Sequence, residues 1–397
     1  MKRQDIRDEI VNMSNPNILC ELPTSFGKSK IAIEVMVSKG ITIKDKILIV
    51  VPRLVLINNW RDEFTKWGYG SYIKYIEFST YISFPKKVGN WDFVIFDECH
   101  HLSLRCQEAL KLFSIKYSVL LSATVKKDTR DTFRLLFRNL GIYKVPVKKA
   151  TEEGILPDPQ VYLIPILLDN VTPNYEIIKN PSKGNPMTVP YSHKWKVHNI
   201  KNRKIIIKCT QLQYYNDMTS FIEWCKKRIH NNLFKNLFLK KSGDRLKWLS
   251  DQKTGLVAYI LTLLNKQRTL TFCNSIAQTE LLGTYCINSK NTLAKVYLDM
   301  FNKKKIKHIT ACNMLDEGVN LVSCRVGIYA TLNSSERMIT QKLGRILRHN
   351  KPIVIIPYFK NTRDEEIVNK MCENYNPQLV KTIDINELET CLSNLKD

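Results

Sequence analysis

The sequence predicts an α/β protein with two parallel-sheet domains in tandem, at residues 1–150 and 251–397, joined by a linker and basic insertion at residues 151–250. Two observations carry this prediction. Short apolar runs alternate with helical spacings in the first segment, and the alternation starts again near residue 256. Strands separated by helices are the pattern of a parallel sheet covered by helices.

The elements of the first segment follow from its apolar runs and turn residues. The run at 46–51 closes at Pro52, and a helix is expected where the spacing becomes helical after Gly27. Strands are expected at 18–22, 46–51, 93–96 and 117–121, and helices at 28–38 and 54–67.

The later segments are interpreted in the same way. Pro157 and Pro159 end the first region, and the proline-broken stretch 170–208 is expected to form a linker or an inserted hairpin before helices over 214–239. In the second domain, strands are expected at 269–272, 306–311, 325–330 and 352–358, and helices at 276–285, 336–347 and 362–374.

Composition indicates a folded protein of a reducing, aqueous compartment inside a cell. The 397 residues are 44% hydrophobic and 25% charged, and no apolar run approaches the roughly 18 residues that cross a bilayer. The N-terminus lacks the apolar core of a signal peptide, and the 11 cysteines show no zinc-site spacing, so free thiols are expected.

The net charge of +24 favours a polyanionic partner. Lys and Arg outnumber Asp and Glu by 17 to 13 in residues 1–125, by 24 to 10 in residues 126–250, and by 20 to 14 in residues 251–397. The middle of the chain is therefore its basic part. The alternative is a solvated lysine surface with no particular partner.

Residues 22–29 lie where the first strand turns into a helix, so that backbone N–H groups and the helix N-terminus can surround phosphates. Lys28 would reach the β- and γ-phosphates, and Ser29 would place its hydroxyl on Mg²⁺. Leu22 and Ser25 stand where many such loops have glycine, so an ordinary strand-turn-helix with a surface lysine is the alternative. The predicted nucleotide-binding residues here are Pro23, Thr24, Ser25, Phe26, Gly27, Lys28 and Ser29.

The acidic turn Asp97-Glu98 follows the strand at 93–96, at a strand tip where Mg²⁺ and nucleotide are held in such sheets. Asp97 is predicted to bind Mg²⁺, and Glu98 to polarise the attacking water. The alternative is an exposed acidic turn. His100 and His101 point apart, which argues against a metal site, and His100 is expected to hydrogen-bond to the second domain.

Residues 341–348 are expected on a helix of the second domain, where Arg345 and Arg348 are three apart and share one face. Two guanidinium groups from a facing domain can stabilise charge on a γ-phosphate. The alternative is a basic helix face without a catalytic role.

These motifs, with Leu121-Ser122-Ala123-Thr124 between the second and third, resemble the superfamily 2 DExH-box helicases and translocases over most of the chain. Within that superfamily the sequence is most similar to compact DNA translocases of the UvsW and RecG types and their poxvirus relatives. The resemblance implies two RecA-like domains that bind ATP and Mg²⁺ between them and move along nucleic acid.

The resemblance also assigns residues by motif. Lys28, Asp97, Glu98, Gln341, Arg345 and Arg348 would be catalytic, and Gln4, Gly318 and Asn320 would join the nucleotide contacts. His100, Ser122 and Thr124 would couple the ATP state to strand binding, and the backbone contacts of the nucleic acid would come from Arg53, Thr80, Phe272 and Asn274.

The middle segment combines basic and aromatic residues, which suit phosphate neutralisation and base stacking. A nucleic-acid contact is therefore proposed for Lys194, Trp195, Lys196, Lys201 and Arg203, with a charged interdomain loop as the alternative. The leading interpretation of the whole chain is a DNA helicase or translocase in replication, recombination or repair, and the high Lys and Asn content hints at a virus or phage. An RNA helicase and a non-catalytic nucleotide- and nucleic-acid-binding subunit of a larger complex are the alternatives.

Overall fold

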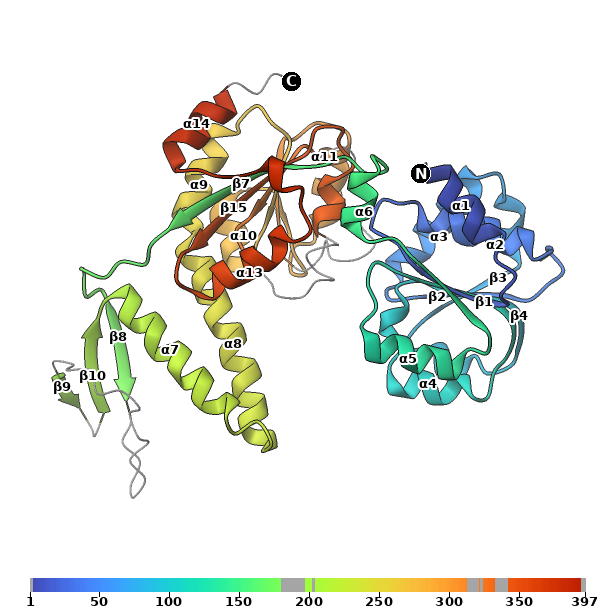
Figure 1. Ribbon diagram of the computed structural model, residues 1–397, viewed down its shortest axis with the longest axis horizontal. Coiled ribbons are helices and arrows are strands. Elements are labelled where there is room, and N and C mark those ends of the chain that lie inside the picture. The colour runs from blue at the N-terminus through green and yellow to red at the C-terminus, as the bar shows by residue number, and fades with distance from the viewer. Residues whose placement is uncertain are drawn as a thin grey trace.

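The computed structural model describes residues 3–179, 197–201, 204–312, 321, 324–332 and 342–393. It contains two parallel sheets, each covered by helices, and a separate arm beside the second sheet (Figure 1). The predicted α/β class with two tandem RecA-like domains is confirmed. Among the described residues, no helix is both long and apolar enough to span a membrane.

The first sheet has six parallel strands in the order β3-β2-β4-β5-β1-β6. The central strands are buried on both faces, which explains their continuous apolar runs. The strands are β1 (Asn17–Glu21), β2 (Ile47–Val51), β3 (Ile76–Thr80), β4 (Asn90–Phe96), β5 (Ser114–Ser122) and β6 (Leu140–Lys144).

Helices cover both faces of this sheet (Figure 1). One face packs on α1 (Arg3–Val11), α2 (Lys28–Ser38) and α3 (Val55–Lys66), and the other on α4 (Leu104–Leu110) and α5 (Lys127–Leu136). A short helix α6 (Val147–Glu152) leads out of the domain.

The second sheet has seven parallel strands in the order β12-β13-β11-β14-β15-β7-β16. Its strands are β7 (Gln160–Ile166), β11 (Thr269–Phe272), β12 (Cys286–Ile287), β13 (His308–Ala311), β14 (Val326–Tyr329), β15 (Ile353–Phe359) and β16 (Val380–Thr382). Its helices are α9 (Thr254–Leu263), α10 (Ile276–Leu282), α11 (Ala294–Asn302), α13 (Arg363–Cys372) and α14 (Ile385–Ser393). Residues 342–346 are also helical.

Strand β7 corrects the predicted domain boundaries. It lies inside the segment 151–250 that the sequence assigns to the linker, yet it pairs with β15 along its whole length, from Gln160 opposite Ile353 to Ile166 opposite Phe359. The chain therefore enters the second sheet before it forms the insertion. Its apolar residues complete the second core, which a linker would not do.

The insertion has two parts. Strands β8 (Tyr175–Lys179), β9 (Val197–Lys201) and β10 (Lys204–Cys209) form an antiparallel sheet, so the expected hairpin is part of a three-stranded unit. Helices α7 (Gln211–Lys226) and α8 (Asn232–Gln252) then form a helical hairpin that projects from the second domain (Figure 1). We call this hairpin the α7–α8 arm.

Candidate functional site between the two domains

The loop between β1 and α2 has the backbone of an anion-binding turn. Ser25 and Gly27 have φ values of 72° and 96°, in the left-handed region that favours glycine. Gly27 is the N-cap of α2 and has no side-chain cap, so the first N–H groups of the helix are left for a ligand. Lys28 and Ser29 follow at the start of this helix.

Glu98 faces Lys28 across the sheet edge. The Nζ of Lys28 lies 3.2 Å from Oε1 of Glu98, and both side chains are largely buried, at 11% and 12% exposed. Glu98 has a φ of 49°, in the left-handed region that few non-glycine residues adopt, and strained backbone of this kind recurs at active sites. Its Oε2 atom is buried, accepts no hydrogen bond in the described part of the chain, and lies 3.5 Å from Nδ1 of His100.

Asp97 is held by two aromatic residues. Trp60 on α3 donates from Nε1 to Oδ2 of Asp97 at 3.0 Å, and the Tyr81 hydroxyl donates to the backbone oxygen of Asp97 at 2.8 Å. Burial, together with the adjacent charge of Glu98, raises the pKa of Asp97 to about 6, against the opposing effects of Lys28 and Trp60. Trp60 and Tyr81 were not among the predicted site residues. The only sequence signal was the position of Trp60 on the helix after Pro52.

The predicted coupling residues form a chain of contacts beside this acidic pair. Nδ1 of His100 lies 3.0 Å from Oγ of Ser122, and Ser122 donates to the backbone oxygen of Thr124 at 3.0 Å. The sequence predicts a bond from His100 to the second domain. The bond to Ser122 lies within the first domain, because β4 and β5 are neighbours in the sheet and end side by side. The expected bond to the second domain stays a prediction, because residues 333–341 lie outside the described part of the chain.

The second domain reaches the phosphate loop through residues 342–348. Oγ of Ser25 donates to the backbone oxygen of Gly344 at 2.6 Å, and Nε of Arg348 donates to the same Oγ at 3.0 Å. A β-carbon on Gly344 would lie 3.2 Å from Cα of Thr24 and closer still to its side chain. Burial lowers the pKa of Arg348, whose Nη1 also donates to the backbone oxygen of Leu321 at 2.8 Å. Arg345 is buried in the same helical segment.

An ion pair between Glu21 and Arg130 lies at the start of the phosphate loop. Glu21, at the end of β1, is 2% exposed and binds Arg130 on α5 through two bonds of 2.6 and 3.0 Å. The same guanidinium donates to the backbone oxygen of Val125 at 3.2 Å. This pair connects the start of the phosphate loop to the segment after Thr124. The sequence reasoning missed it, although an acidic residue at the end of an apolar strand was a visible signal.

The residues present fit a magnesium ion with bound phosphates. Ser29 and Asp97 offer hydroxyl and carboxylate oxygens, the ligand types that Mg²⁺ prefers. The buried Oε2 of Glu98 is a further acceptor at the same edge. The opposing Lys28 and the N-terminus of α2 supply positive charge for phosphate oxygens.

Gln4, predicted to contact the nucleotide, makes its described hydrogen bonds within helix α1. Its amide donates to Asp8 at 2.7 Å and accepts from Arg7, both on its own helix α1, and it is exposed. The neighbouring Arg3 instead approaches the loop, with its guanidinium 5.8 Å from the ring of Phe26.

The predicted nucleic-acid residues separate into three groups. Arg53 is exposed after β2, and Thr80 ends the adjacent β3, opposite Val51, so these two share the carboxyl edge of the first sheet. Asn274 follows β11 in the second domain. The prediction for Phe272 is wrong, because this side chain is 3% exposed and packs 5.1 Å from the ring of Tyr329 in the core.

The remaining predictions fall where the structure gives no side-chain position. Lys201 ends β9, and only its backbone is described. The other residues lie outside the described part of the chain: Lys194, Trp195, Lys196, Arg203, Gly318, Asn320 and Gln341.

The sequence is similar to those of known proteins. Residues 4–127 match the family described as the res subunit of type III restriction enzymes. The DNA 3'-5' translocase XPB2 of Sulfurisphaera tokodaii is 22% identical over 343 residues, which are 82% of this chain and 74% of that protein.

Two solved structures share the fold. The first is Dbp5 of S. cerevisiae bound to RNA and ADP BeF3, with a TM-score of 0.61 and 10% identity, covering 98% of this chain and 92% of Dbp5. The second is the DEAD-box helicase Mss116 bound to ssRNA and UDP-BeF, with a TM-score of 0.56 and 13% identity, covering 98% of this chain and 75% of Mss116.

Proposed function

We propose that the chain is an ATP-dependent helicase or translocase of superfamily 2 that moves along or remodels DNA, with branched or duplex DNA as its substrate. The observation that carries the proposal is the contact between Arg348 and Ser25. An arginine of the second domain rests on the phosphate loop of the first. A ligand bound at that loop is therefore touched by both domains, and its hydrolysis changes how they are held together.

Each residue of the site has a role in this reaction. The N–H groups at the start of α2 and Lys28 bind the β- and γ-phosphates of ATP. Ser29 and Asp97 hold Mg²⁺, which neutralises phosphate charge when it is bound. Glu98 orients and deprotonates the attacking water through its buried Oε2, which has His100 Nδ1 at 3.5 Å beside it.

Arg345 and Arg348 stabilise the charge that develops on the γ-phosphate. Both are carried by the helical segment that contacts Thr24 and Ser25, so their position depends on how closely the domains approach. Hydrolysis removes the γ-phosphate from this contact, and the domains separate. Repeated approach and separation move the domains along a strand.

The similarity to XPB2, a DNA translocase by name, supports DNA over RNA. Arg53 and Thr80 lie at the carboxyl edge of the first sheet, as strand contacts would require, and Asn274 follows a strand of the second sheet. Contacts of this kind read the backbone, so little sequence preference and strong salt dependence are expected.

The substrate is tested by the steady-state ATPase rate, measured alone and with single-stranded DNA, duplex DNA, a four-way DNA junction and single-stranded RNA, each at two salt concentrations. DNA is expected to stimulate turnover, and the junction to do so most strongly. Stimulation by RNA alone would move the substrate to RNA. A rate that no nucleic acid changes would remove the motor function itself.

A further inference from the structure

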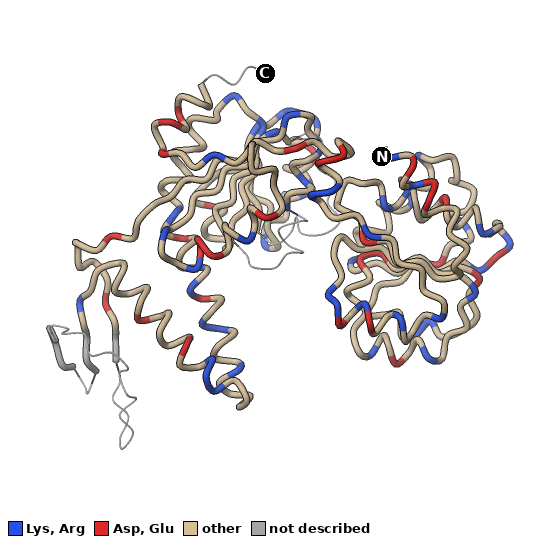
Figure 2. Tube along the Cα trace, viewed as in Figure 1, with Lys and Arg blue, Asp and Glu red and all other residues tan. Residues whose placement is uncertain are grey.

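The free end of the α7–α8 arm has a distinctive surface. Between residues 226 and 241 the chain carries six Lys and Arg and no Asp or Glu. Three apolar side chains in the same stretch face solvent, with Ile229 44%, Leu233 63% and Leu239 58% exposed. Figure 2 shows basic residues gathered at this end of the arm. The basic residues are Lys226, Lys227, Arg228, Lys235, Lys240 and Lys241.

The tip is a firmly packed structure. The ring of Trp224 on α7 lies 5.7 Å from that of Phe221 and 5.1 Å from that of Phe234 on α8, and the guanidinium of Arg228 sits 4.4 Å over the Trp224 ring. Aromatic and cation–π contacts of this kind fix the two helix ends relative to each other. The exposed apolar residues are therefore presented on a rigid end.

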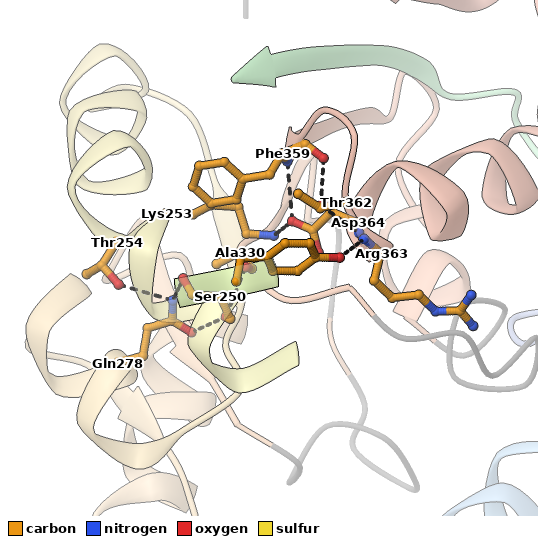
Figure 3. A network of polar contacts seen from close by, with 10 residues as sticks. Ser250, Lys253, Thr254, Gln278, Ala330, Phe359, Thr362, Arg363 and Asp364 are labelled. Carbon is orange, nitrogen blue, oxygen red and sulfur yellow. Dashed lines mark hydrogen bonds and ion pairs between the residues drawn. The ribbon is translucent and has the colours of Figure 1, made fainter. Parts of the chain in front are cut away.

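The base of the arm, at residues 250–253, is attached to the second domain by buried polar contacts (Figure 3). Ser250, near the end of α8, donates to Gln278 on α10 at 2.9 Å and to the backbone oxygen of Ala330 at 3.0 Å. Lys253 forms a buried ion pair of 2.8 Å with Asp364 on α13. Such contacts are costly to break, so the arm moves with its domain.

The same network reaches a predicted strand contact. The carboxamide oxygen of Gln278 accepts from the backbone N–H of Asn274, at 3.0 Å. Ser250 and Asn274 thus share one side chain as hydrogen-bond partner. Helix α8 is roughly 30 Å long for its 21 residues, so a small rotation of the domain displaces the tip by a larger distance.

We infer that the tip of the α7–α8 arm is a second nucleic-acid contact, which binds a junction between paired and unpaired strands. This inference rests on the proposed motor function. The lysines neutralise phosphates on the strands, and Leu233 and Leu239 lie against sugars and unpaired base faces. Lys235 and Leu239 are four residues apart and lie on one face of α8, so one strand can meet both.

The positive charge of the tip favours nucleic acid as its ligand. Within residues 226–241 every ionisable side chain apart from His230 is basic. Lys226 and Lys241 pair with Glu223 and Asp244 at the borders of this stretch, so the net positive charge of the tip comes from Lys227, Arg228, Lys235 and Lys240. Nucleic acid supplies the matching uniform negative charge. Exposed apolar side chains beside it favour bases that are not stacked in a duplex, because paired bases present their faces only to each other.

The phosphate contacts are tested by exchanging lysines for glutamine at the tip and at a control site. The tip variant is K227Q/K235Q/K240Q, and the control variant is K304Q/K305Q/K307Q, which removes the same charge from the loop before β13, at the opposite edge of the sheet from Asn274. All six lysines are exposed, and none forms an ion pair within the described part of the chain. Binding of forked DNA is measured by fluorescence anisotropy over a range of salt.

The tip variant is expected to lower the slope of log affinity against log salt by roughly 2–3 for three lost phosphate contacts, and the control to leave it unchanged. Equal effects of the two variants would overturn the inference. The inference would also be overturned if the tip variant lost as much affinity for single-stranded DNA as for forked DNA.

The apolar contact has its own test, L233A/L239A, which leaves the charge intact. Strand separation per ATP hydrolysed on forked DNA should fall at least about threefold, while ATP turnover with single-stranded DNA stays the same. An unchanged ratio would contradict the role given to the leucines. If the unmodified protein shows no DNA-stimulated turnover, the motor function fails. If it does and the tip variants behave as the control, only the arm inference fails.

Discussion

Arg348 donates a hydrogen bond from Nε to Oγ of Ser25 at 3.0 Å, although the two residues belong to different sheets and lie 323 positions apart. Ser25 in turn donates to the backbone of Gly344, one turn before Arg348. A loop hydroxyl therefore joins the two domains at the place where the phosphates of ATP are expected.

Replacing Arg348 with alanine should lower the maximal rate of ATP hydrolysis on the order of 10³-fold, since it removes positive charge that acts on the γ-phosphate. Binding of ATP should weaken much less. Both are measured by steady-state kinetics and by titration with a fluorescent nucleotide. The matched control is R134A, an exposed arginine on α5. An unchanged maximal rate in R348A would contradict the role.

Gly344→Ala should weaken the approach of the domains without damaging either fold. The added methyl group would lie 3.2 Å from Cα of Thr24, where backbone cannot move aside easily. ATP turnover is expected to fall at least tenfold while the thermal unfolding temperature stays within a few degrees. Gly255→Ala in α9, where a methyl group meets nothing within 4 Å, is the control. Full activity in G344A would show that the domains need not approach this closely.

Arg130→Ala should lower the free energy of unfolding by about 3 kcal/mol, because it leaves the buried carboxylate of Glu21 without its partner. The double replacement E21L/R130M should recover most of this loss, since no charge then remains buried. Urea unfolding of the three proteins measures both effects. If R130A had the same free energy of unfolding as the parent protein, the ion pair would not be needed for stability.

Asp97→Asn should stabilise the protein at pH 8 in the presence of a metal chelator. The native state holds the Asp97 proton more tightly than the unfolded chain, since its pKa is about 6 against an ordinary 3.8. Ionisation of Asp97 therefore costs stability as pH rises through this window, about 3 kcal/mol in full. The gain in D97N should vanish below about pH 4. A variant that is less stable than the parent at pH 8 would contradict the shift.

Much of the fold follows from local patterns. The helix expected at 28–38 and the strand expected at 269–272 agree with α2 and β11 to the residue, because both are bounded by clear turn residues. The edge strand β3 escaped detection because it is only half-buried and therefore lacks a continuous apolar run. Strand β7 was assigned to the linker because a sequence does not show which sheet a strand joins.

The site was predictable where spacing alone brings residues together. Lys28 and Glu98 meet because β1 and β4 end at the same edge of a parallel sheet. Phe272 was predicted to contact nucleic acid from its motif position alone, and that position does not show that its side chain is buried. The bond from Trp60 to Asp97 depends on the exact turn of α3 toward the sheet, which no sequence spacing specifies.

The central claim is that this chain hydrolyses ATP in response to nucleic acid, with Glu98 activating the water. The most direct measurement compares ATP turnover by the parent protein and E98Q with saturating forked DNA, and ATP binding in parallel. We predict DNA-stimulated turnover in the parent, and in E98Q a loss of at least about 10²-fold with ATP binding retained. Equal turnover in the two proteins, or none in the parent, would contradict it.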